Sequence, residues 1–435
     1  MIYLRKGKKK KKINIRRIIV LIIILLIIFG SIIYFLVSKN NKEKNILKNK
    51  NNLIADINKH YNKYVITNKK TKLYNKDNKV IGEINKDINL NLVVIDKIDE
   101  NNKYLEISDF KDTYILYSDI DKIDEITIDS RYKNYIPFNI NIKTNDKTTF
   151  YDEYGELLYS LNGSYELPVY IKDSDMYGVE FNNSLVYIKK DDIKEEFENK
   201  NTDKFNSSGV AVLNYHFFYD EDNPDDKGCN EEICASKSQF KSHLDYFKDN
   251  NIFTIKMHEL ELYMDGKLRL PKSVLITIDD GVRTKLGVDM LTEYKMYGTI
   301  FLITSWYDVP NYYVTDYIEL HSHSHNMHNG GKCSGGQGAE IKCLDRDTIL
   351  DDLKKSRELL NNTTAFCYPF YEYNSYSEGL LKEAGFTMAF IGEKTASYGP
   401  YKLAEVNGDK MKIPRFVVVT YTTMSELKKY FNEIK

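Results

Sequence analysis

The fold of the C-terminal half is decided by the stretch Ser273-Val274-Leu275-Ile276-Thr277-Ile278-Asp279-Asp280-Gly281. Its apolar and β-branched run predicts a strand, and the strand ends in two adjacent carboxylates. Because successive side chains of a strand point to opposite sides, Asp279 and Asp280 are expected to serve different purposes. One can bind a metal ion while the other accepts a proton. An isolated Asp-Asp-Gly is more often a simple turn, so the interpretation depends on its surroundings.

The surroundings of this strand predict repeated β/α units. Short apolar strands alternate with helical patterns, which is typical of a parallel sheet covered by helices. The predicted strands are Val210–Leu213, Ser273–Ile278, Thr299–Thr304, Tyr317–Leu320, Thr364–Tyr368, Phe386–Ile391 and Ile413–Val418. Helical patterns follow a Ser236 or Ser238 cap and Asp347. A distorted (β/α) barrel over residues 208–435 is the simplest assembly, with its chemistry at the carboxyl ends of the strands.

A histidine cluster follows the predicted strand Tyr317–Leu320. His321, His323, His325 and His328 are four of the eight histidines of the chain. Neutral imidazoles and one carboxylate, with one position open for water, suit zinc or a similar divalent ion. An adventitious His-rich surface loop is the alternative, and the nearby carboxylates make it the weaker one.

These residues together resemble the NodB-like polysaccharide deacetylases. The family motif T-[FY]-D-D-G is matched by Thr277-Ile278-Asp279-Asp280-Gly281, with Ile in the aromatic position. The resemblance covers about residues 208 to 435. It implies a metal-dependent hydrolase with Asp279 as the proton acceptor and Asp280 as a metal ligand.

The second motif of the family can be placed in two ways. H-[ST]-x-x-H fits His321 and His325. A branch that acts on poly-N-acetylglucosamine has one more residue between the ligands, which fits His323 and His328 and puts Glu319 at the usual offset. We favour His323 and His328 as the ligands.

The later motifs depart from the family pattern. R-x-P-[YF]-G is answered by Cys367-Tyr368-Pro369-Phe370-Tyr371, which keeps the proline and the aromatic residue but lacks the Arg and the Gly. The Phe370 N–H remains a candidate for holding an oxyanion. The missing Arg leaves the tuning of Asp279 open, and Arg415 is the candidate replacement.

The family also uses a histidine near its C-terminus as the general acid, and this chain has no histidine after His328. His216, at the end of the first predicted strand, is a candidate for that role or for substrate contact, against the alternative of a simple hydrogen-bonded histidine. Tyr371 and Arg415 complete the candidate substrate contacts.

The N-terminal segment predicts a membrane anchor. Residues 18–37 carry no charge, and a helix of that length rises about 30 Å, enough to cross a bilayer core. The preceding tail, residues 1–17, is strongly basic, which holds it in the cytoplasm. A cleavable signal peptide is the alternative, but no small-residue cleavage site follows. We expect a single-pass protein of the cell membrane with its catalytic domain outside.

Two β-rich segments connect the anchor to the catalytic domain. A polar stalk at 38–59 precedes strand-and-turn patterns at 60–126 and 134–197, which share short internal similarities. They resemble bacterial SH3-type modules, which implies either wall binding or a spacer role.

Charge and cysteines narrow the remaining possibilities. The chain has a net charge of −1, and without the basic tail the rest is at about −10, which argues against nucleic acid as a partner. An external compartment permits Cys229 to pair with Cys234 and Cys333 with Cys343, and leaves Cys367 free. Metal binding by cysteines is the alternative, although no CxxC spacing supports it.

The expected function is removal of N-acetyl groups from an external glycan, either peptidoglycan or poly-N-acetylglucosamine. An O-acetyl esterase with the same site and a catalytically silent glycan-binding protein are the alternatives. The absence of the terminal histidine and of the motif Arg motivates the second of these.

Overall fold

The computed structural model divides the chain into two compact units, Met1–Thr127 and Ile128–Lys435. It describes residues 28–31, 33–39, 41–42, 44, 63–67, 70–85, 89–92, 104–106, 113–116, 119–125, 130–181, 184–199, 207–226, 229, 231–392 and 402–435. Each unit is treated by itself below.

The first unit contains β-strands within residues 63–125. Its strands are β1 (Lys63–Thr67), β2 (Thr71–Asn75), β3 (Val80–Ile84), β4 (Asn89–Leu92), β5 (Tyr104–Glu106), β6 (Thr113–Leu116) and β7 (Ile120–Glu125). They pair antiparallel in the orders β4-β1-β7 and β3-β2-β6-β5. Leu73, Ile84 and Ile115 are fully buried. The described residues between 63 and 125 thus contain the β-strands that the sequence predicts, whereas the module bounds 60–126 and the likeness to SH3-type modules stay predictions.

The predicted membrane span falls only partly on described residues. Residues 28–31 and 33–39 are helical, whereas 18–27 and 32 lie outside the described residues, as does the tail at 1–17. Of the stalk at 38–59, only residues 38, 39, 41, 42 and 44 are described. No helix in the described parts of the chain has both the length and the apolar character needed to span a membrane.

The second unit begins with a seven-stranded antiparallel sheet. Its elements are η2 (Arg131–Asn134), β8 (Ile140–Thr144), β9 (Lys147–Tyr151), β10 (Leu157–Asn162), β11 (Glu166–Lys172), β12 (Met176–Phe181), β13 (Ser184–Lys189), η3 (Lys190–Asp192) and β14 (Ile193–Glu198). The strand order is β14-β8-β11-β12-β13-β9-β10. This sheet shares its compact unit with the α/β part, because Ile171 pairs with Leu268 and Arg131 forms an ion pair with Glu259.

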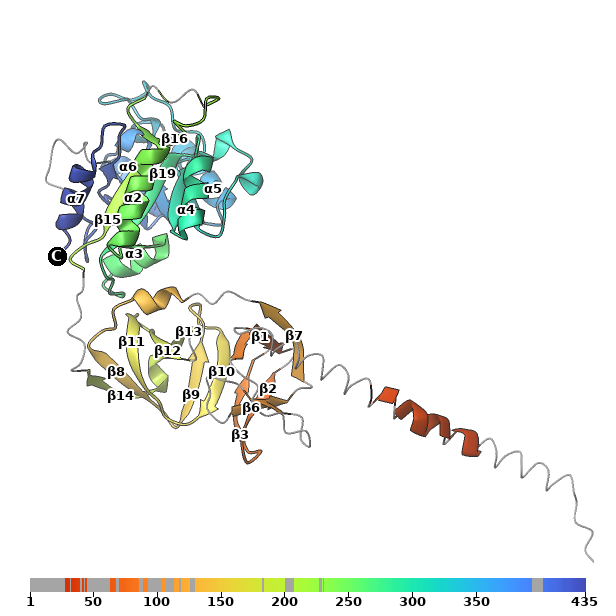
Figure 1. The fold of residues 1–435 in the computed structure, drawn as a ribbon. Coiled ribbons are helices and arrows are strands. Elements are labelled where there is room, and N and C mark those ends of the chain that lie inside the picture. The colour runs from red at the N-terminus through yellow and green to blue at the C-terminus, as the bar shows by residue number, and fades with distance from the viewer. Residues whose placement is uncertain are drawn as a thin grey trace, which may run out of the picture. The chain divides into compact units, whose positions relative to one another are not determined.

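The α/β part is a curled parallel sheet covered by helices (Figure 1). Its strands are β15 (Ala211–Tyr215), β18 (Phe253–Thr254), β19 (Ser273–Asp280), β20 (Gly298–Leu302), β21 (Ile318–Ser322), β22 (Ala365–Cys367), β23 (Met388–Phe390) and β24 (Phe416–Val417). The order is β23-β22-β21-β20-β19-β15-β24, and β18 pairs with β19. A parallel bridge joins Phe390, at the end of β23, to Ile413, which precedes β24. The predicted (β/α) barrel and its seven strands are confirmed, with shifted ends.

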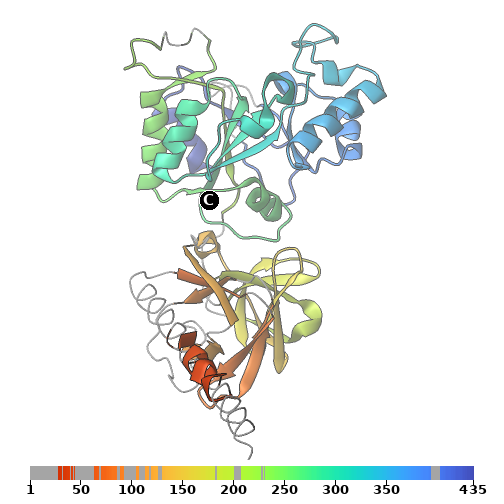
Figure 2. The same ribbon diagram turned by 90° about the vertical axis from the view of Figure 1, so that its right-hand side faces the viewer.

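Most helices lie on the outer face of this sheet (Figure 2), whereas the helix Met257–Met264 packs with the buried cluster that contains Leu275. The helices are α2 (Lys237–Asp249), α3 (Met257–Met264), α4 (Lys285–Tyr294), α5 (Arg346–Leu359), α6 (Ser375–Glu383) and α7 (Met424–Asn432). Ser236 caps α2 as predicted, because its hydroxyl accepts the N–H of Gln239. The cap of α5 is Asp345, so the predicted start at Asp347 is wrong by two residues. A small parallel pair, β16 (Phe217–Tyr219) with β17 (Cys234–Ser236), precedes α2.

Strand β19 forms the centre of the core because every one of its residues is buried. Ile276 and Ile278 pack toward the outer helices, whereas Leu275 belongs to the cluster inside the barrel. Each fully buried side chain of this type contributes about 1.5–3 kcal/mol relative to an exposed one. The same alternation directs Thr277 and Asp279 into the barrel.

Both expected disulfides are formed and Cys367 is free and buried. The Cα atoms of Cys333 and Cys343 are 5.7 Å apart, and those of Cys229 and Cys234 are 6.1 Å apart.

Candidate active site

The two carboxylates diverge because the chain turns sharply at the end of β19. Asp279 keeps the strand direction, whereas Asp280 and Gly281 have φ values of 68° and 86°. A Cβ at Gly281 would overlap the side chain of Leu302, so only glycine fits there. The turn places Asp280 on a different side of the strand end from Asp279.

Asp280 meets two histidines. Its Oδ1 lies 3.3 Å from His323 Nε2 and 3.4 Å from His328 Nε2. This oxygen is buried and accepts no hydrogen bond from the part of the chain that the structure describes. A buried anionic oxygen without a donor is costly unless a cation accompanies it. Two imidazoles and one carboxylate converging at this spacing fit a divalent metal ion.

The second ring nitrogen of His323 fixes the orientation of that ligand. His323 Nδ1 donates to the carbonyl of Cys367 at 2.8 Å, so Nε2 is the nitrogen directed at Asp280. Such outer hydrogen bonds set the tautomer and the direction of metal-binding imidazoles. Burial lowers the pKa of His328 to about 4, so His328 is neutral at neutral pH. The neutral ring is the form that binds metal.

The alternative pair of histidines lies elsewhere. His321 Nδ1 is hydrogen-bonded with Thr363 Oγ1 at 2.6 Å, and His325 Nδ1 with Thr304 Oγ1 at 2.9 Å. Neither belongs to the cluster around Asp280. The favoured placement of the second motif, on His323 and His328, is therefore the one that the structure brings together. Glu319 accepts the N–H of Met257 at 2.9 Å.

Asp279 is held by Arg415 on both of its oxygens. Arg415 Nη1 and Nη2 donate to Oδ1 and Oδ2 at 2.7 Å and 2.8 Å. The thiol of Cys367 donates to Oδ2 at 3.3 Å and accepts from Arg415 at 3.0 Å. Burial opposes ionisation of Asp279, but the charge of Arg415 outweighs it and holds the pKa of Asp279 well below its usual value. Asp279 is therefore an ionised, fixed carboxylate.

The expected substrate contact by Arg415 is wrong. Its side chain has no exposed surface, and its remaining donors bind Ile391 O at 3.1 Å and Thr277 Oγ1 at 3.2 Å. All of these partners are protein groups. Arg415 instead takes the place of the missing motif Arg beside Asp279, as the alternative expectation proposed.

His216 and Tyr371 lie at the same end of the barrel. Tyr371 donates to Asn214 Oδ1 at 2.8 Å, and its hydroxyl is 3.2 Å from His216 Nε2. His216 Nε2 is also 3.9 Å from Asp279 Oδ2. Burial lowers the pKa of His216, so its imidazole is neutral at neutral pH. The structure thus brings His216 close to the carboxylate of Asp279, although α2 and α3 lie between the two residues in the sequence.

The segment η7 (Pro369–Tyr371) carries backbone strain next to the metal cluster. Phe370 and Tyr371 have φ values of 55° and 61°, which side chains other than glycine rarely adopt. Tyr371 occupies the position where the family has glycine, so its contacts with Asn214 and His216 must offset the strain. The ring of Phe370 lies 4.5 Å from that of His328, which puts this segment directly beside the site.

Three further residues near the site were not predicted. Trp306 contacts the ring of His328 at 5.8 Å and is half exposed, Asn214 binds Tyr371, and Glu372 holds the loop that follows His328. An exposed tryptophan after a strand, the only one in the sequence, was the available signal for Trp306. No sequence signal marked Asn214 or Glu372.

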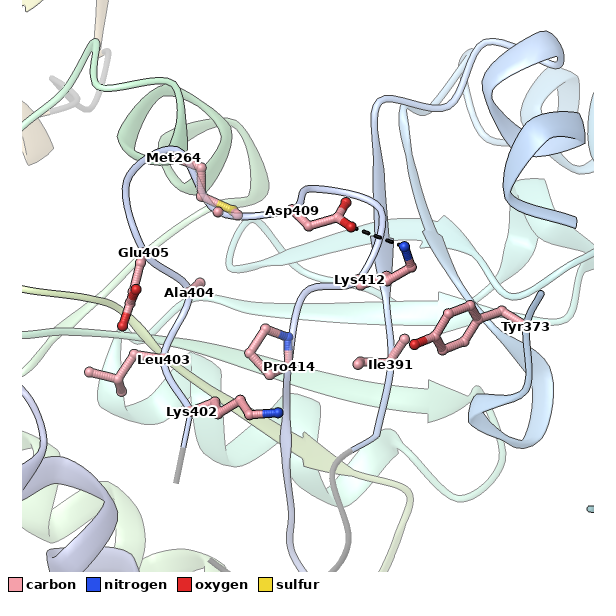
Figure 3. A pocket seen from close by; sticks show the side chains of 11 residues that line it. Met264, Tyr373, Ile391, Lys402, Leu403, Ala404, Glu405, Asp409, Lys412 and Pro414 are labelled. Atoms are coloured by element: carbon pink, nitrogen blue, oxygen red, sulfur yellow. Dashed lines mark hydrogen bonds and ion pairs between the residues drawn. The ribbon is translucent and has the colours of Figure 1, made fainter. Parts of the chain in front are cut away.

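A separate pocket of about 310 Å³ lies outside this cluster (Figure 3). It is lined by Met264, Tyr373, Ile391, Lys402, Leu403, Ala404, Glu405, Gly408, Asp409, Lys412 and Pro414. Lys412 forms an ion pair with Asp409 at 3.1 Å across its wall. None of its residues belongs to the metal cluster, so the pocket is not the reaction site.

Residues 267–389 match the model of the family Polysaccharide deacetylase. The segment runs from the approach to β19 into β23 and includes Asp279, Asp280, His323 and His328, whereas His216 lies outside it. This match indicates a polysaccharide deacetylase domain over these residues and makes the chain a hydrolase of the deacetylase class. Comparison with curated protein sequences finds no match.

Several solved structures are similar to parts of the chain. A de-N-acetylase from Aggregatibacter actinomycetemcomitans has 19% identity and a TM-score of 0.43, covering 51% of this chain and 99% of its own. IcaB from Ammonifex degensii has 19% identity and a TM-score of 0.42, covering 52% and 96%. BC0361, a polysaccharide deacetylase from Bacillus cereus, has 16% identity and a TM-score of 0.40, covering 75% and 98%.

Proposed function

We propose that this chain hydrolyses the N-acetyl groups of an extracellular or cell-wall polysaccharide, peptidoglycan or poly-N-acetylglucosamine, with a bound divalent metal ion. The observation that carries the proposal is the position of the Arg415-held carboxylate of Asp279 beside the cluster of Asp280, His323 and His328. A proton acceptor and a cation site then lie side by side in a buried setting, which is the arrangement that hydrolysis of an unactivated amide needs.

The metal ion belongs between Asp280, His323 and His328. Two imidazoles and one carboxylate with an open position favour zinc. When bound, the ion supplies a Lewis acid for the acetyl carbonyl and for the attacking water. The chain's own contribution to the ligands is their pre-arrangement, because the Cys367 carbonyl already fixes the ring of His323.

The proton path runs through Asp279 and His216. Asp279, ionised and fixed, accepts the proton that the attacking water loses. His216 is neutral, so it must first receive the proton that it gives to the leaving nitrogen. Asp279 is the source of this proton, because its Oδ2 is 3.9 Å from His216 Nε2. The N–H of Phe370 is the candidate donor to the oxyanion. The amide bond breaks, and acetate and a free amine leave.

The proposal includes the location of the enzyme. The run at 18–37 carries no charge, and its described apolar side chains, such as Phe29, Phe35 and Leu36, are exposed. A bilayer would cover such a surface. We therefore propose a single-pass membrane protein with an external catalytic domain, to be checked by protease accessibility of intact cells against lysed cells.

Acetate release tests the reaction. The full chain in detergent, loaded with zinc, is offered N-acetylated peptidoglycan and poly-N-acetylglucosamine. Asp279→Asn should lower the rate about 10²- to 10⁴-fold, because it removes the general base. Asp289→Asn is the matched control, since Asp289 lies on the surface of α4 and pairs with Lys285. The fluorescence of Trp306 checks that each variant is folded.

The outcomes separate the alternatives. Release from either polymer that Asp279→Asn abolishes supports the proposal and ranks the substrates. Release from O-acetylated glycans alone would make the enzyme an esterase. Zinc binding with no release from any of these substrates would instead indicate a glycan-binding protein.

A further inference from the structure

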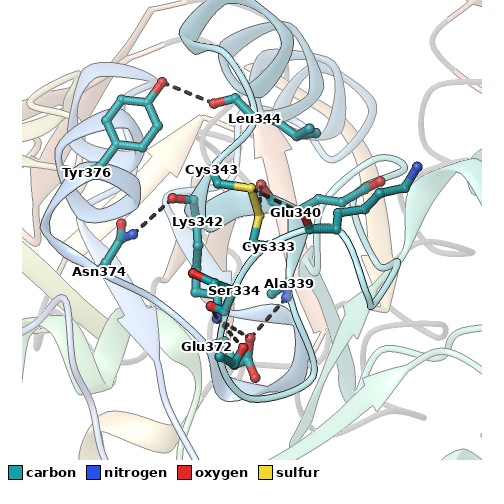
Figure 4. Close-up of a disulfide and its surroundings, with 12 residues drawn as sticks. Cys333, Ser334, Ala339, Glu340, Lys342, Cys343, Leu344, Glu372, Asn374 and Tyr376 are labelled. Atoms are coloured by element: carbon teal, nitrogen blue, oxygen red, sulfur yellow. Dashed lines mark hydrogen bonds and ion pairs between the residues drawn. A yellow bond between two sulfur atoms is a disulfide. The ribbon is translucent and has the colours of Figure 1, made fainter.

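A disulfide-closed loop begins directly after the metal-ligand candidate His328. This clipped loop, residues 329–343, is joined by the bond between Cys333 and Cys343 (Figure 4). Its first residue, Asn329, donates to the carboxylate of Glu340 at 3.0 Å. The start of the loop is therefore joined to its end by this hydrogen bond and by the disulfide. Because His328 precedes Asn329, a shift of the loop would also move His328.

Two glycines of the clipped loop lie too close to their neighbours to carry a side chain. Gly338 has a φ of 77°, and a Cβ there would lie 2.7 Å from the carbonyl oxygen of Cys333. Gly336 has a φ of 61°, and a Cβ there would overlap the carboxylate of Glu372. Glycine is required at both positions because L side chains rarely adopt this φ and lack space. The contact with Glu372 shows where the loop meets the rest of the domain.

Glu372 holds the loop through three donors. Its carboxylate accepts the N–H groups of Gln337 and of Ala339, the latter at 3.0 Å, and the ammonium of Lys342 at 2.7 Å. Lys342 also donates to two carbonyl oxygens of the loop, those of Ser334 at 3.2 Å and Gly335 at 2.8 Å. Burial opposes the charge of Glu372, but the hydrogen bond from Lys342 outweighs it and lowers the pKa of Glu372. The carboxylate of Glu372 is thus ionised, and both of its oxygens accept hydrogen bonds from the loop.

Glu372 is also the residue after the strained segment η7. Phe370 and Tyr371 hold left-handed conformations that persist only when the surroundings fix them. Phe370 lies against His328, and His328 precedes the clipped loop. The contacts therefore form a ring: His328, loop, Glu372, Phe370 and back to His328.

We propose that Glu372 is a positioning residue that ties the clipped loop to the η7 segment and so fixes His328 for metal binding and Phe370 for catalysis. The inference rests on the proposed function: its metal-binding part on the proposed metal site, and its catalytic part on the proposed hydrolysis. Glu372 touches neither the metal cluster nor the reacting atoms. It acts through the two residues that do.

The test replaces Glu372 by Gln in the full chain in detergent. The amide offers one acceptor oxygen in place of two and carries no charge, so one loop N–H loses its acceptor and Lys342 loses its ion pair. We expect the zinc dissociation constant, from competition with a chromophoric chelator, to rise about 10-fold or more, as for other outer-shell changes. The kcat of acetate release should fall by a similar factor, with KM changed less than about twofold.

Glu378→Gln is the matched control. Glu378 has a similar side-chain exposure of 17% against 14% for Glu372 and also pairs with lysines. Its partners, Lys382 and Lys412, lie outside the clipped loop. Its zinc affinity and kcat should stay at the native values. If Glu372→Gln does not fold, Lys342→Gln, which removes the ion pair from the loop side, should show the same shifts at smaller size.

A double variant, Cys333→Ser with Cys343→Ser, opens the loop without touching Glu372. If Glu372 acts through the loop, adding Glu372→Gln to the open loop should weaken zinc binding by less than about threefold further. Full additivity of the two effects contradicts the proposal, as does a folded Glu372→Gln with native zinc affinity and kcat. A native chain that binds zinc but releases no acetate contradicts the proposed function alone, because the zinc measurement still decides the role of Glu372.

Discussion

Replacing Arg415 by Met should reverse the pH dependence of the contribution that Asp279 makes to the stability of the deacetylase domain. In the native chain this contribution is lost as the pH falls, whereas in the variant stability is lost as the pH rises. The native pair is buried and has two charge-assisted hydrogen bonds, of 2.7 Å and 2.8 Å, between Arg415 and Asp279. Each bond of this kind contributes about 1.5–3 kcal/mol. Removing one partner of a buried pair costs about 3–5 kcal/mol, since the other charge stays buried alone. We therefore expect a loss of about 3–5 kcal/mol at pH 7.

The pH dependence follows from the pKa of Asp279, which is lowered in the native chain and should be raised in the variant. In the native chain that pKa lies below its unfolded value of about 4, so the stabilisation is present above about pH 4 and is lost as the pH falls further. In Arg415→Met the buried, unpaired carboxyl should have a raised pKa, so its folded state takes up a proton and loses stability as the pH rises above about 4. The difference between native and variant should grow from pH 4 to pH 7.

The assay is urea unfolding followed by the fluorescence of Trp306, which lies in the α/β part and is the only tryptophan of the chain. Arg357→Met is the control, because Arg357 binds backbone carbonyls such as that of Thr363 at 2.8 Å and has no carboxylate partner in these bonds. Its destabilisation should not change with pH between 4 and 7. A loss under about 1 kcal/mol for Arg415→Met, or a difference that is constant with pH, would refute the reasoning.

Three further predictions concern metal binding, acid stability and substrate size. His328→Ala should weaken zinc binding by about 100-fold while His321→Ala leaves the affinity of the folded protein unchanged, as measured by equilibrium dialysis. Burial lowers the pKa of His243 from 6.5 to about 4, so the native state loses about 3 kcal/mol as the pH falls from 6.5 to 4. His243→Gln should remove that part of the acid sensitivity in urea unfolding curves. Trp306→Ala should lower kcat/KM on a polysaccharide about 10-fold while hydrolysis of a small acetate ester is unchanged, because a half-exposed indole beside His328 can stack on a sugar ring of a polymer.

The sequence was sufficient to predict those features that depend on residues close together in the chain. Strand β19 could be predicted from one apolar run, and the alternation of its side chains predicted different roles for Asp279 and Asp280. The histidine spacing allowed two ligand pairs, and only the end of β21 at Ser322 decides between them. His321 lies within the strand and reaches Thr363, whereas His323 begins the loop and faces Asp280.

The evidence that sequence could not supply is distant along the chain. Arg415 is 136 residues from Asp279 in the sequence, and no local pattern around either residue predicts that they form a hydrogen bond. The expected substrate contact failed because the bridge between Phe390 and Ile413 draws the following residues into the barrel. Glu372 was missed for the same reason, since its partners belong to a loop about 30 residues earlier, whose fold depends on a disulfide.

The closing strand has a consequence for how the protein is made. β24 pairs with β15, the first strand of the barrel, so synthesis must reach the end of the domain before the sheet is complete. Until then β15 and β23 have unpaired edges, which attract other chains. Such long-range pairing also slows folding. The unfinished domain should therefore depend on chaperones while it folds, and Asp279 meets the guanidinium of Arg415 only when the sheet is complete.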